Sequence, residues 1–433
     1  MHKIRVVKTD LFRDTIFMFF LKVSSAILGI ASNIIFARIL SMEEYGVFVQ
    51  LIASVTILAT IITIGSPSLL TREVASYKAH ESWELLKGLV IWSSKRLLFS
   101  GLVSVVLCLL IMVLYVPKYL QLSGLLVLLL ILISVINQIR AAILRGLHSV
   151  IAADLPDQVL QPSIILLTLG VSFWISSINK DVSFCLLASL LGSIFSLIIG
   201  LLFLYKAWPP ITKVTKIKVD IDLWNKSSKI FFMISVLSIV DSQIVTLLVG
   251  YFSDAISAGI FQACTRLVVL VVFGLVIVNT TILPRIASAW SQKDIIYMQY
   301  LVTYAAKNGS YFAIISCAPL LVFPEWFLGL FGSGYESGSM ALRILLIGQL
   351  VNTISGPCGI ILTMTGHQIF AFKALALSVL VSITSNTLLI PRLGLTGAAI
   401  SVATSMIIWN LLMVYWVKKK TGILSTAFIR LKQ

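Results

Sequence analysis

Charged residues are scarce in this sequence, and eight long stretches contain none. Charged residues make up 12% of the 433 positions and apolar residues 59%, with a mean hydropathy of +1.03. A bilayer core takes about 20 apolar residues per helix, and backbone groups in lipid must pair within the helix. The sequence therefore predicts an all-α polytopic membrane protein and excludes an ordinary soluble globular chain. The uncharged stretches are 46–71, 97–117, 119–139, 158–179, 182–205, 267–284, 344–372 and 393–417.

Paired cysteines, metal-binding motifs and nucleotide-binding motifs are absent as well. The five cysteines lie singly in apolar segments, which is typical of small core residues rather than of disulfides. No GxxxxGK[ST] motif occurs, so a built-in ATP motor is excluded, and the four histidines lack metal-ligand spacing. We therefore expect no catalytic residue, no metal site and no bound cofactor. The cysteines are Cys108, Cys185, Cys264, Cys317 and Cys358.

Twelve membrane-spanning helices fit the pattern of apolar stretches. With the N-terminus inside, 26 of the 33 Lys and Arg residues fall on the cytoplasmic side and 5 outside, and Lys22 and Arg266 lie within helices. This bias predicts that both termini are cytoplasmic. It also accounts for the net charge of +16 without a nucleic-acid partner. The predicted spans are 15–37, 47–70, 97–116, 122–143, 158–178, 182–205, 230–251, 258–283, 308–330, 341–365, 368–390 and 396–417.

A basic hydrophilic segment divides the spans into two sets of six. The first span is long and carries Lys22, so we interpret it as a retained helix rather than a cleaved signal peptide. Segment 71–96 is predicted to form an amphipathic helix on the inner leaflet, with Trp83, Leu85, Leu86 and Leu89 on its apolar side. The predicted domains are an N-terminal bundle at 1–205, a cytoplasmic linker at 206–229, a C-terminal bundle at 230–417 and a cytoplasmic tail at 418–433.

The two halves repeat short patterns at the same spacing. Gly46-Val47-Phe48 is followed by Arg72, 26 positions after Gly46, and Gly259-Ile260-Phe261 is followed by Arg285 at the same distance. A second echo pairs residues 144–148 with 363–367. Six helices per repeat leave both halves in the same orientation, and parallel repeats of this kind are typical of transporters that work by alternating access.

Three charged residues lie well inside predicted spans, away from the span ends, where each costs at least about 2.5–3.5 kcal/mol. Lys22 shares a helix face with Asn33, Asp241 falls near the middle of the seventh span among serines, and Arg266 lies in the eighth span. A buried Asp241–Arg266 or Asp241–Lys22 pair could only hold the bundles together. The other interpretation is a role in binding a substrate or a coupling ion.

Two further polar positions are candidates for a cavity. Arg140 lies beside Asn137 and Gln138, and both a cavity mouth and a guanidinium that reaches the headgroups fit its place near the end of the fourth span. Asn352 is close to Pro357 in the tenth span, and this proline predicts a kink.

Several motifs, in order along most of the chain, resemble one family. The chain is similar to polysaccharide-export flippases of the Wzx type, in the superfamily that also holds the MATE drug exporters. The resemblance implies a MATE-like pair of six-helix bundles that flips a lipid-linked oligosaccharide, such as an O-antigen or capsule repeat unit on undecaprenyl diphosphate. The motifs are Ala37-Arg38-Ile39-Leu40 with Tyr45-Gly46-Val47-Phe48, Arg72-Glu73-Val74-Ala75, Asp241, Gly259 to Arg266, Leu283-Pro284-Arg285-Ile286-Ala287, and Leu389-Ile390-Pro391 with Gly397-Ala398-Ala399.

This resemblance implies a bacterial cytoplasmic (inner) membrane protein, driven by a proton or sodium gradient, with the polymerase and chain-length proteins of the same pathway as partners. For such a cargo we expect Lys22 and Arg266 to bind the diphosphate at two successive stations. Arg140, Asn33 and Asn352 are further candidates for substrate binding. We expect Asp241 to be the ion-coupling residue.

Three alternatives to this function stay open. A MATE-type cation or drug antiporter shares the architecture but favours carboxylates in its cleft, whereas the interior of the predicted spans holds Asp241 as its one acid against two cations, Lys22 and Arg266. A peptidoglycan-precursor flippase usually has two more helices. A polysaccharide polymerase or ligase fits less well, because the predicted outer loops are short and hold few polar groups.

The predicted topology can be tested with reporter fusions. We expect a fusion after Asn179 to report the periplasm or exterior and a fusion after Tyr205 to report the cytoplasm, because the basic residues lie overwhelmingly on one side. Alkaline phosphatase and green fluorescent protein activities measure the two locations. Opposite signals at either position would contradict the twelve-helix arrangement.

Overall fold

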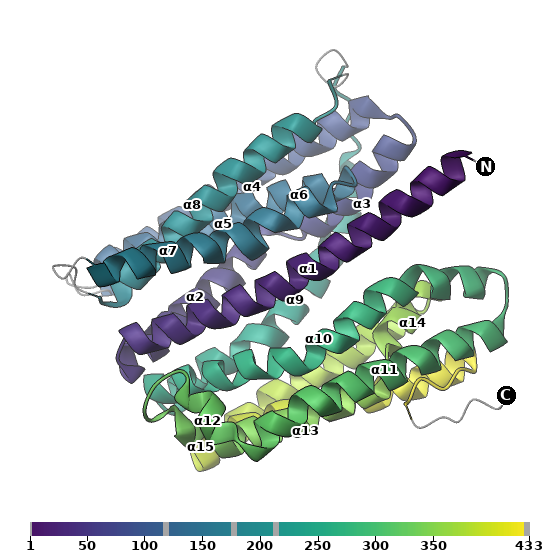
Figure 1. The fold of residues 1–433 in the computed structure, drawn as a ribbon. Helices are drawn as coiled ribbons and strands as arrows, with labels where there is room; N and C mark the ends of the chain where they lie inside the picture. Colours follow the sequence, from purple (N-terminus) through teal and green to yellow (C-terminus); the bar gives the residue numbers. More distant parts are fainter. Residues whose placement is uncertain (1, 116–120, 175–179, 211–215, 428–433) are drawn as a thin grey trace. The chain divides into compact units, whose positions relative to one another are not determined.

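The computed structural model describes a chain whose regular elements, within the described residues, are all helices (Figure 1). The backbone is described for residues 2–115, 121–174, 180–210 and 216–427. Side chains are described over the same ranges except at 2–16, 18–19, 107–115, 121, 173–174, 273–285, 287–288 and 291. The predicted all-α class is confirmed.

The helices of the first half of the chain are long, and short turns separate most of them. They are α1 (His2–Ile39), α2 (Met42–Thr63), α3 (Ser66–Ala79), α4 (Trp83–Tyr115), α5 (Gln121–Gly146), α6 (Val150–Leu155), the π-helix η2 (Pro156–Leu160), α7 (Gln161–Trp174), α8 (Val182–Ala207) and α9 (Ile221–Phe252). The second half contains α10 (Ala255–Ser291), α11 (Ile295–Val322), α12 (Pro324–Gly329), the 3-10 helix η4 (Tyr335–Gly338), α13 (Ser339–Ser355), α14 (Cys358–Met364) and α15 (Gln368–Thr421).

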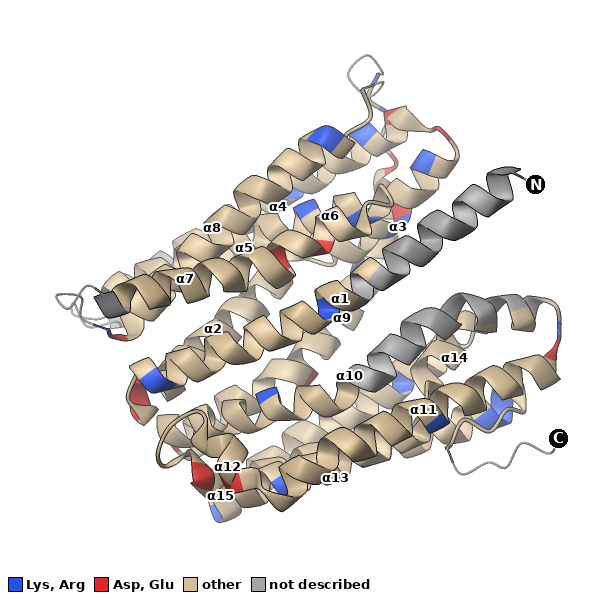
Figure 2. Ribbon diagram, viewed as in Figure 1, with Lys and Arg blue, Asp and Glu red and all other residues tan. Residues whose placement is uncertain are grey.

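Ten helical segments within the described residues are long and apolar enough to cross a membrane. The segment Gln368–Thr421 contains a non-helical residue, Gly394, and therefore covers two of the predicted spans. The predicted ninth span corresponds to α11. The chain is thus a multi-span membrane protein, and the twelve predicted spans agree with its helices. Figure 2 shows long stretches without charge along α7 and α8.

The chain divides into two compact units, each described by itself. Unit 1 comprises Met1–Leu40 and Leu51–Gln243, and unit 2 comprises Ser41–Gln50 and Ile244–Gln433. Helices α2 and α9 therefore contribute residues to both units. The predicted bundle boundaries at residues 205 and 230 stay predictions.

One end of unit 1 has a core that the sequence did not predict. Trp224 is fully buried in it and donates its indole N–H to the Tyr77 hydroxyl at 2.9 Å, and its ring packs at a tilt against Trp92, with the ring centres 5.5 Å apart. Burial raises the pKa of Tyr77 above its ordinary value, so its hydroxyl stays protonated. Leu86 and Leu89 are also fully buried there. The predicted amphipathic helix on the leaflet is therefore wrong, because its apolar face packs inside the protein.

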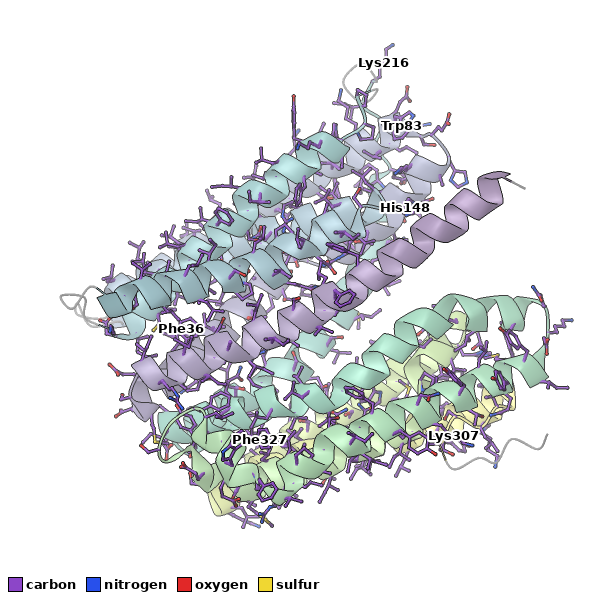
Figure 3. All side chains as sticks on the ribbon, viewed as in Figure 1. Phe36, Trp83, His148, Lys216, Lys307 and Phe327 are labelled. Carbon is purple, nitrogen blue, oxygen red and sulfur yellow. The ribbon has the colours of Figure 1, made fainter. Side chains whose placement is uncertain are left out.

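The hydrophilic segment before α9 folds back onto this core. The backbone N–H of Lys218 donates to the carbonyl of Glu84 near the start of α4 at 3.3 Å. Figure 3 shows Trp83 and Lys216 at the same end of unit 1. Helix α9 begins at Ile221 rather than at the predicted Ile230, because burial of Trp224 stabilises its first turns.

Two breaks shape the helices of unit 2. Gly356 has a φ of 77° and separates α13 from α14, so the kink predicted at Pro357 is confirmed. Only glycine adopts this conformation without strain. Gly394 (φ 54°, ψ −134°) interrupts α15, and the rings of Phe370 and Trp416 near its two ends lie 4.5 Å apart. Helix α15 is therefore an antiparallel hairpin of two spans.

The cysteines behave as the sequence predicts wherever their side chains are described. Cys185, Cys264, Cys317 and Cys358 are buried and form no disulfide with another described residue, and Cys108 lies outside the described side chains. Nine basic residues that contribute to the predicted topology also lie outside the described side chains. They are Lys3, Arg5, Lys8, Arg13, Lys118, Lys213, Arg285, Arg430 and Lys432.

Candidate functional site

Two carboxylates lie deeper in unit 1 than the sequence analysis placed them. The predicted fifth span begins at Gln158, whereas the helical path begins at Val150 and runs through η2 into α7. The membrane-spanning candidate is therefore Val150–Ser172, which includes Asp154 and Asp157. The expectation that Asp241 is the lone acid of the spans is wrong. The predicted span started at the first residue of the uncharged stretch 158–179, which left Asp154 and Asp157 outside it.

Asp157 forms a buried ion pair with Arg140 on α5. Nη2 of Arg140 donates to both carboxylate oxygens, at 2.7 and 2.8 Å, and the Ser196 hydroxyl on α8 also donates to this carboxylate. The Arg140 side chain is only 1% exposed. A Cβ at Gly200 would overlap the guanidinium, so this glycine provides the space for it. Arg140 therefore lies in the interior of unit 1, and its role in substrate binding stays a prediction.

The Arg140 guanidinium is incompletely satisfied. Its Nε and Nη1 are buried and have no hydrogen-bond partner among the described atoms. Buried donors without partners are rare, and each costs about 1–3 kcal/mol. The negative charge of Asp157 offsets the desolvation cost of burying the Arg140 guanidinium.

Asp154 is shared by two cations. Arg145 on α5 donates to its Oδ1 through Nε at 3.0 Å and Nη2 at 2.8 Å, and Nζ of Lys22 on α1 lies 3.6 Å from its Oδ2. Lys22 also donates to the side-chain oxygen of Gln158 at 2.8 Å. Asp154 is largely buried, whereas Lys22 is 37% exposed. The predicted Asp241–Lys22 pair is wrong, because Lys22 pairs with Asp154.

Together these residues form a charge cluster, defined here as Lys22, Arg140, Arg145, Asp154 and Asp157. Three cations face two carboxylates, so the cluster carries one excess positive charge. It joins α1, α5, α6 and η2, and Ser196 adds α8. Figure 2 shows basic and acidic residues together along α5 and α6. A signal for it exists in the sequence: Asp154 and Asp157 are three positions apart, a spacing that puts two acids on one helix face, and they follow two arginines of the preceding helix.

The remaining predicted residues of unit 1 are spread over two helices. Nδ2 of Asn33 donates to the Gly29 carbonyl on α1 at 2.7 Å. Asp241 on α9 is half-buried and has no hydrogen bond or ion pair with another described residue. A half-buried carboxylate of this kind is a candidate for reversible protonation or cation binding. Its predicted pairing with Arg266 stays a prediction, since the two residues belong to different units.

Arg266 on α10 belongs to unit 2 and has a neutral partner. The side-chain oxygen of Gln262, in the amide orientation that its neighbours favour, accepts from Arg266 Nη2 at 2.8 Å and Nε at 3.0 Å. No carboxylate of the described part of unit 2 lies in ion-pair distance of Arg266. Asn352 on α13 is half-buried, and the described contacts do not join it to Arg266. Arg266 is thus a cation within a span whose charge the described side chains of unit 2 leave uncompensated.

Residues of the two echoed motifs meet beside Arg266. Tyr45 is fully buried, and its ring would lie 3.1 Å from a Cβ at Gly259. A Cβ at Gly46 would overlap the Ala255 carbonyl. The start of α2 and the start of α10 therefore approach so closely that neither Gly46 nor Gly259 can carry a side chain without rearrangement. The ring of Tyr335 packs edge-on against that of Tyr45, with the ring centres 6.0 Å apart.

Comparison with known proteins gives one family model and one curated relative, and both belong to glycan biosynthesis. The family model described as polysaccharide biosynthesis protein matches residues 11–290. A probable low-salt glycan biosynthesis flippase of Haloferax volcanii is 22% identical over 177 residues, which is 41% of this chain but only 38% of that protein.

Solved structures of similar fold cover nearly the whole chain. An inward-facing multidrug resistance MATE family transporter of the MOP superfamily matches with a TM-score of 0.72 at 14% identity, over 93% of this chain and 98% of its own. The lipid II flippase MurJ, in an inward closed conformation, matches with a TM-score of 0.72 at 18% identity, over 93% of this chain and 87% of its own. The predicted MATE-like fold is confirmed.

The Arg140–Asp157 pair yields a testable prediction. Asp157→Asn should destabilise the protein by about 3–5 kcal/mol, because it leaves a buried guanidinium without a counter-charge. The double variant Arg140→Met with Asp157→Asn should recover most of that loss, since no buried charge remains. Thermal unfolding of the detergent-purified protein measures both. As a control, Arg343→Met with Glu325→Gln removes an exposed ion pair and should change stability by less than about 1 kcal/mol. A double variant no more stable than Asp157→Asn would contradict the pairing.

Proposed function

Because the chain belongs to the polysaccharide biosynthesis protein family, we propose that it is a flippase for a lipid-linked oligosaccharide. The cargo would be an O-antigen or capsule repeat unit on undecaprenyl diphosphate, moved from the inner to the outer leaflet of the bacterial cytoplasmic membrane. Both termini would be cytoplasmic, and the polymerase and chain-length proteins of the pathway would receive the product. The protein would act as a transporter and not as an enzyme.

The observation that carries this proposal is the excess of positive charge within the spans. Arg266 has only the neutral Gln262 as described partner, and the charge cluster around Asp154 holds one more cation than acids. A diphosphate carries at least two negative charges, and such a headgroup cannot enter hydrocarbon without compensation. Uncompensated cations inside a membrane protein fit an anionic cargo better than a cationic one.

Lys22 supports this proposal in a specific way. Its side chain is 37% exposed, and Arg145 alone already balances the Asp154 carboxylate. An anionic headgroup could therefore take over Lys22 without leaving Asp154 uncompensated. Asp154 and Gln158 would hold the ammonium in place until the cargo arrives.

The membrane potential would help such a cargo outward. An anion that moves from an inside-negative cytoplasm to the exterior gains about 2.3 kcal/mol per charge per 100 mV. Alternating access between inward-open and outward-open states would expose the cations to each side in turn. A proton or sodium gradient acting at Asp241 would return the empty protein.

A cation antiporter is the second candidate, and Asp241 is the observation that favours it. This carboxylate has no described partner, as a cation site requires. Asp154 and Asp157, in the candidate span Val150–Ser172, are neutralised by arginines and are therefore poor sites for a cation. We place the flippase first because the proposed binding residues comprise two cations, Arg266 and Lys22, and only one acid without a described partner, Asp241.

Removal of the two cations tests the proposal. We expect Lys22→Ala and Arg266→Ala each to lower surface polysaccharide at least tenfold, because each removes a charge that the headgroup must contact. Lys22→Arg should keep part of the activity, since a positive charge is the main requirement. Export is measured by blotting of surface polysaccharide in a strain that lacks its own flippase, with membrane accumulation checked in parallel. Lys206→Ala, at the exposed end of α8, is the matched control. Normal export by both alanine variants would rule out the assignment.

Replacement of Asp241 tests its proposed role in ion coupling. Asp241→Asn should accumulate and fold normally, because no described partner is lost, yet export should no longer respond to an imposed proton or sodium gradient. Flipping of a labelled lipid-linked glycan in proteoliposomes measures this response. Gradient-dependent flipping that survives in the Asn variant would remove the coupling role from Asp241.

A further inference from the structure

One end of the α15 hairpin presents a cluster of lysines on aromatic rings. The rings of Phe370 and Trp416 stack at 4.5 Å, and Tyr415 packs edge-on against Trp416 at 5.1 Å. Lys420 lies 4.7 Å and Lys373 lies 5.8 Å from the centre of the Phe370 ring. The two ends of one hairpin thus build a single surface, which we call the lysine–aromatic surface.

A third lysine completes this surface. Nζ of Lys419 lies 5.4 Å from the centre of the Tyr415 ring and 5.5 Å from that of Trp416, and it donates to the Tyr415 hydroxyl at 3.1 Å. Lys418 precedes it on the same exposed end of α15. None of these four lysines forms an ion pair with a carboxylate of the described residues. The surface therefore carries four positive charges without an internal counter-charge.

The core of unit 2 holds this surface in a defined geometry. Val417 and Ile423 are fully buried in the same core cluster, and Trp416 and Phe370 pack against it. Gly422, with a φ of 73°, ends α15 directly after the lysines. The lysines are thus presented by a rigid helix end and not by a free tail.

The level of this surface relative to the membrane follows from the hairpin. Both legs of α15 are long apolar helices, so their two adjacent ends lie where hydrocarbon meets water. Tyrosine and tryptophan favour this level, and lysines reach from it to the headgroups. Below the lysines, exposed aliphatic side chains continue along both legs, at Leu377 and Leu411.

We propose that the lysine–aromatic surface binds the phosphate headgroup of an anionic phospholipid, such as phosphatidylglycerol, in the leaflet that meets this end of α15. The lysines would contact the phosphate, the rings would lie along the glycerol region, and Leu377 and Leu411 would contact the acyl chains. A soluble acidic partner would contact the lysines but not Leu377 and Leu411, which lie farther along the spans. A lipid can contact both groups, so the surface favours a lipid. This site is separate from Lys22 and Arg266 and does not depend on the proposed cargo.

Fluorescence quenching by brominated lipids tests this proposal at a single residue. Brominated phosphatidylglycerol and brominated phosphatidylcholine are titrated into the purified full chain in mixed micelles, and the signal of a Trp416→Phe variant is subtracted to isolate Trp416. We expect phosphatidylglycerol to quench Trp416 at a mole fraction at least tenfold lower than phosphatidylcholine. High salt should remove this preference, because headgroup attraction is electrostatic. Equal quenching by both lipids at low salt would overturn the proposal.

Lysine variants show whether the named side chains are responsible. Lys373→Gln with Lys420→Gln should lower the affinity for phosphatidylglycerol about fivefold per charge removed, whereas Lys226→Gln with Lys229→Gln, two exposed lysines of α9, should leave it unchanged. An unaltered preference in the first pair, or an equal loss in the control pair, would contradict the site. The salt dependence of the unaltered chain keeps the test valid if the first pair fails to fold. Displacement by millimolar inorganic phosphate, beyond chloride at equal ionic strength, would also overturn a lipid-specific site.

Discussion

The cost of placing charge in hydrocarbon is the constraint on which the rest of this structure depends. It keeps most charges out of the spans, and it requires the few that enter to be paired or to reach water. Arg140 meets it by an ion pair with Asp157 inside unit 1. Lys22 meets this requirement because its side chain is partly exposed and its ammonium pairs with Asp154, which also pairs with Arg145. Each exception therefore has a visible physical compensation, or marks a place where a ligand would supply one.

The π-helical turn η2 is the local device that makes this compensation possible in unit 1. It joins α6 to α7 without ending the helical path, and it carries Asp157 and Gln158 toward α5 and α1. Turns of this kind are rare and are often found at functional sites. Compared with a regular α-helix, the extra residue of a π-turn rotates the residues before the turn relative to those after it. The turn therefore sets which side chains face Arg140 and which face Lys22.

The two units compensate their cations differently, which bears on function. In unit 1 every described cation of the cluster contacts a carboxylate, so removal of an acid should mainly affect folding. In unit 2 the described side chains offer Arg266 only an amide and no counter-charge. The lysine–aromatic surface differs from both. Its lysines have no carboxylate partner among the described residues and lie at the membrane boundary, and their ammonium groups lie over aromatic rings.

Hydropathy and charge bias determined the class of this protein, the approximate places of its spans and the break at Gly356–Pro357, because the bilayer selects length, polarity and helix breakers directly from the sequence. They also singled out Lys22 and Arg266. Only the tertiary structure decided which groups Lys22 and Arg140 contact, that Trp224 forms a core with α3 and α4, and that Asp154 and Asp157 lie within a span. Those outcomes depend on contacts between helices distant in the sequence, and a hydropathy pattern reports the preference of each residue for lipid or water but not the residue that will face it.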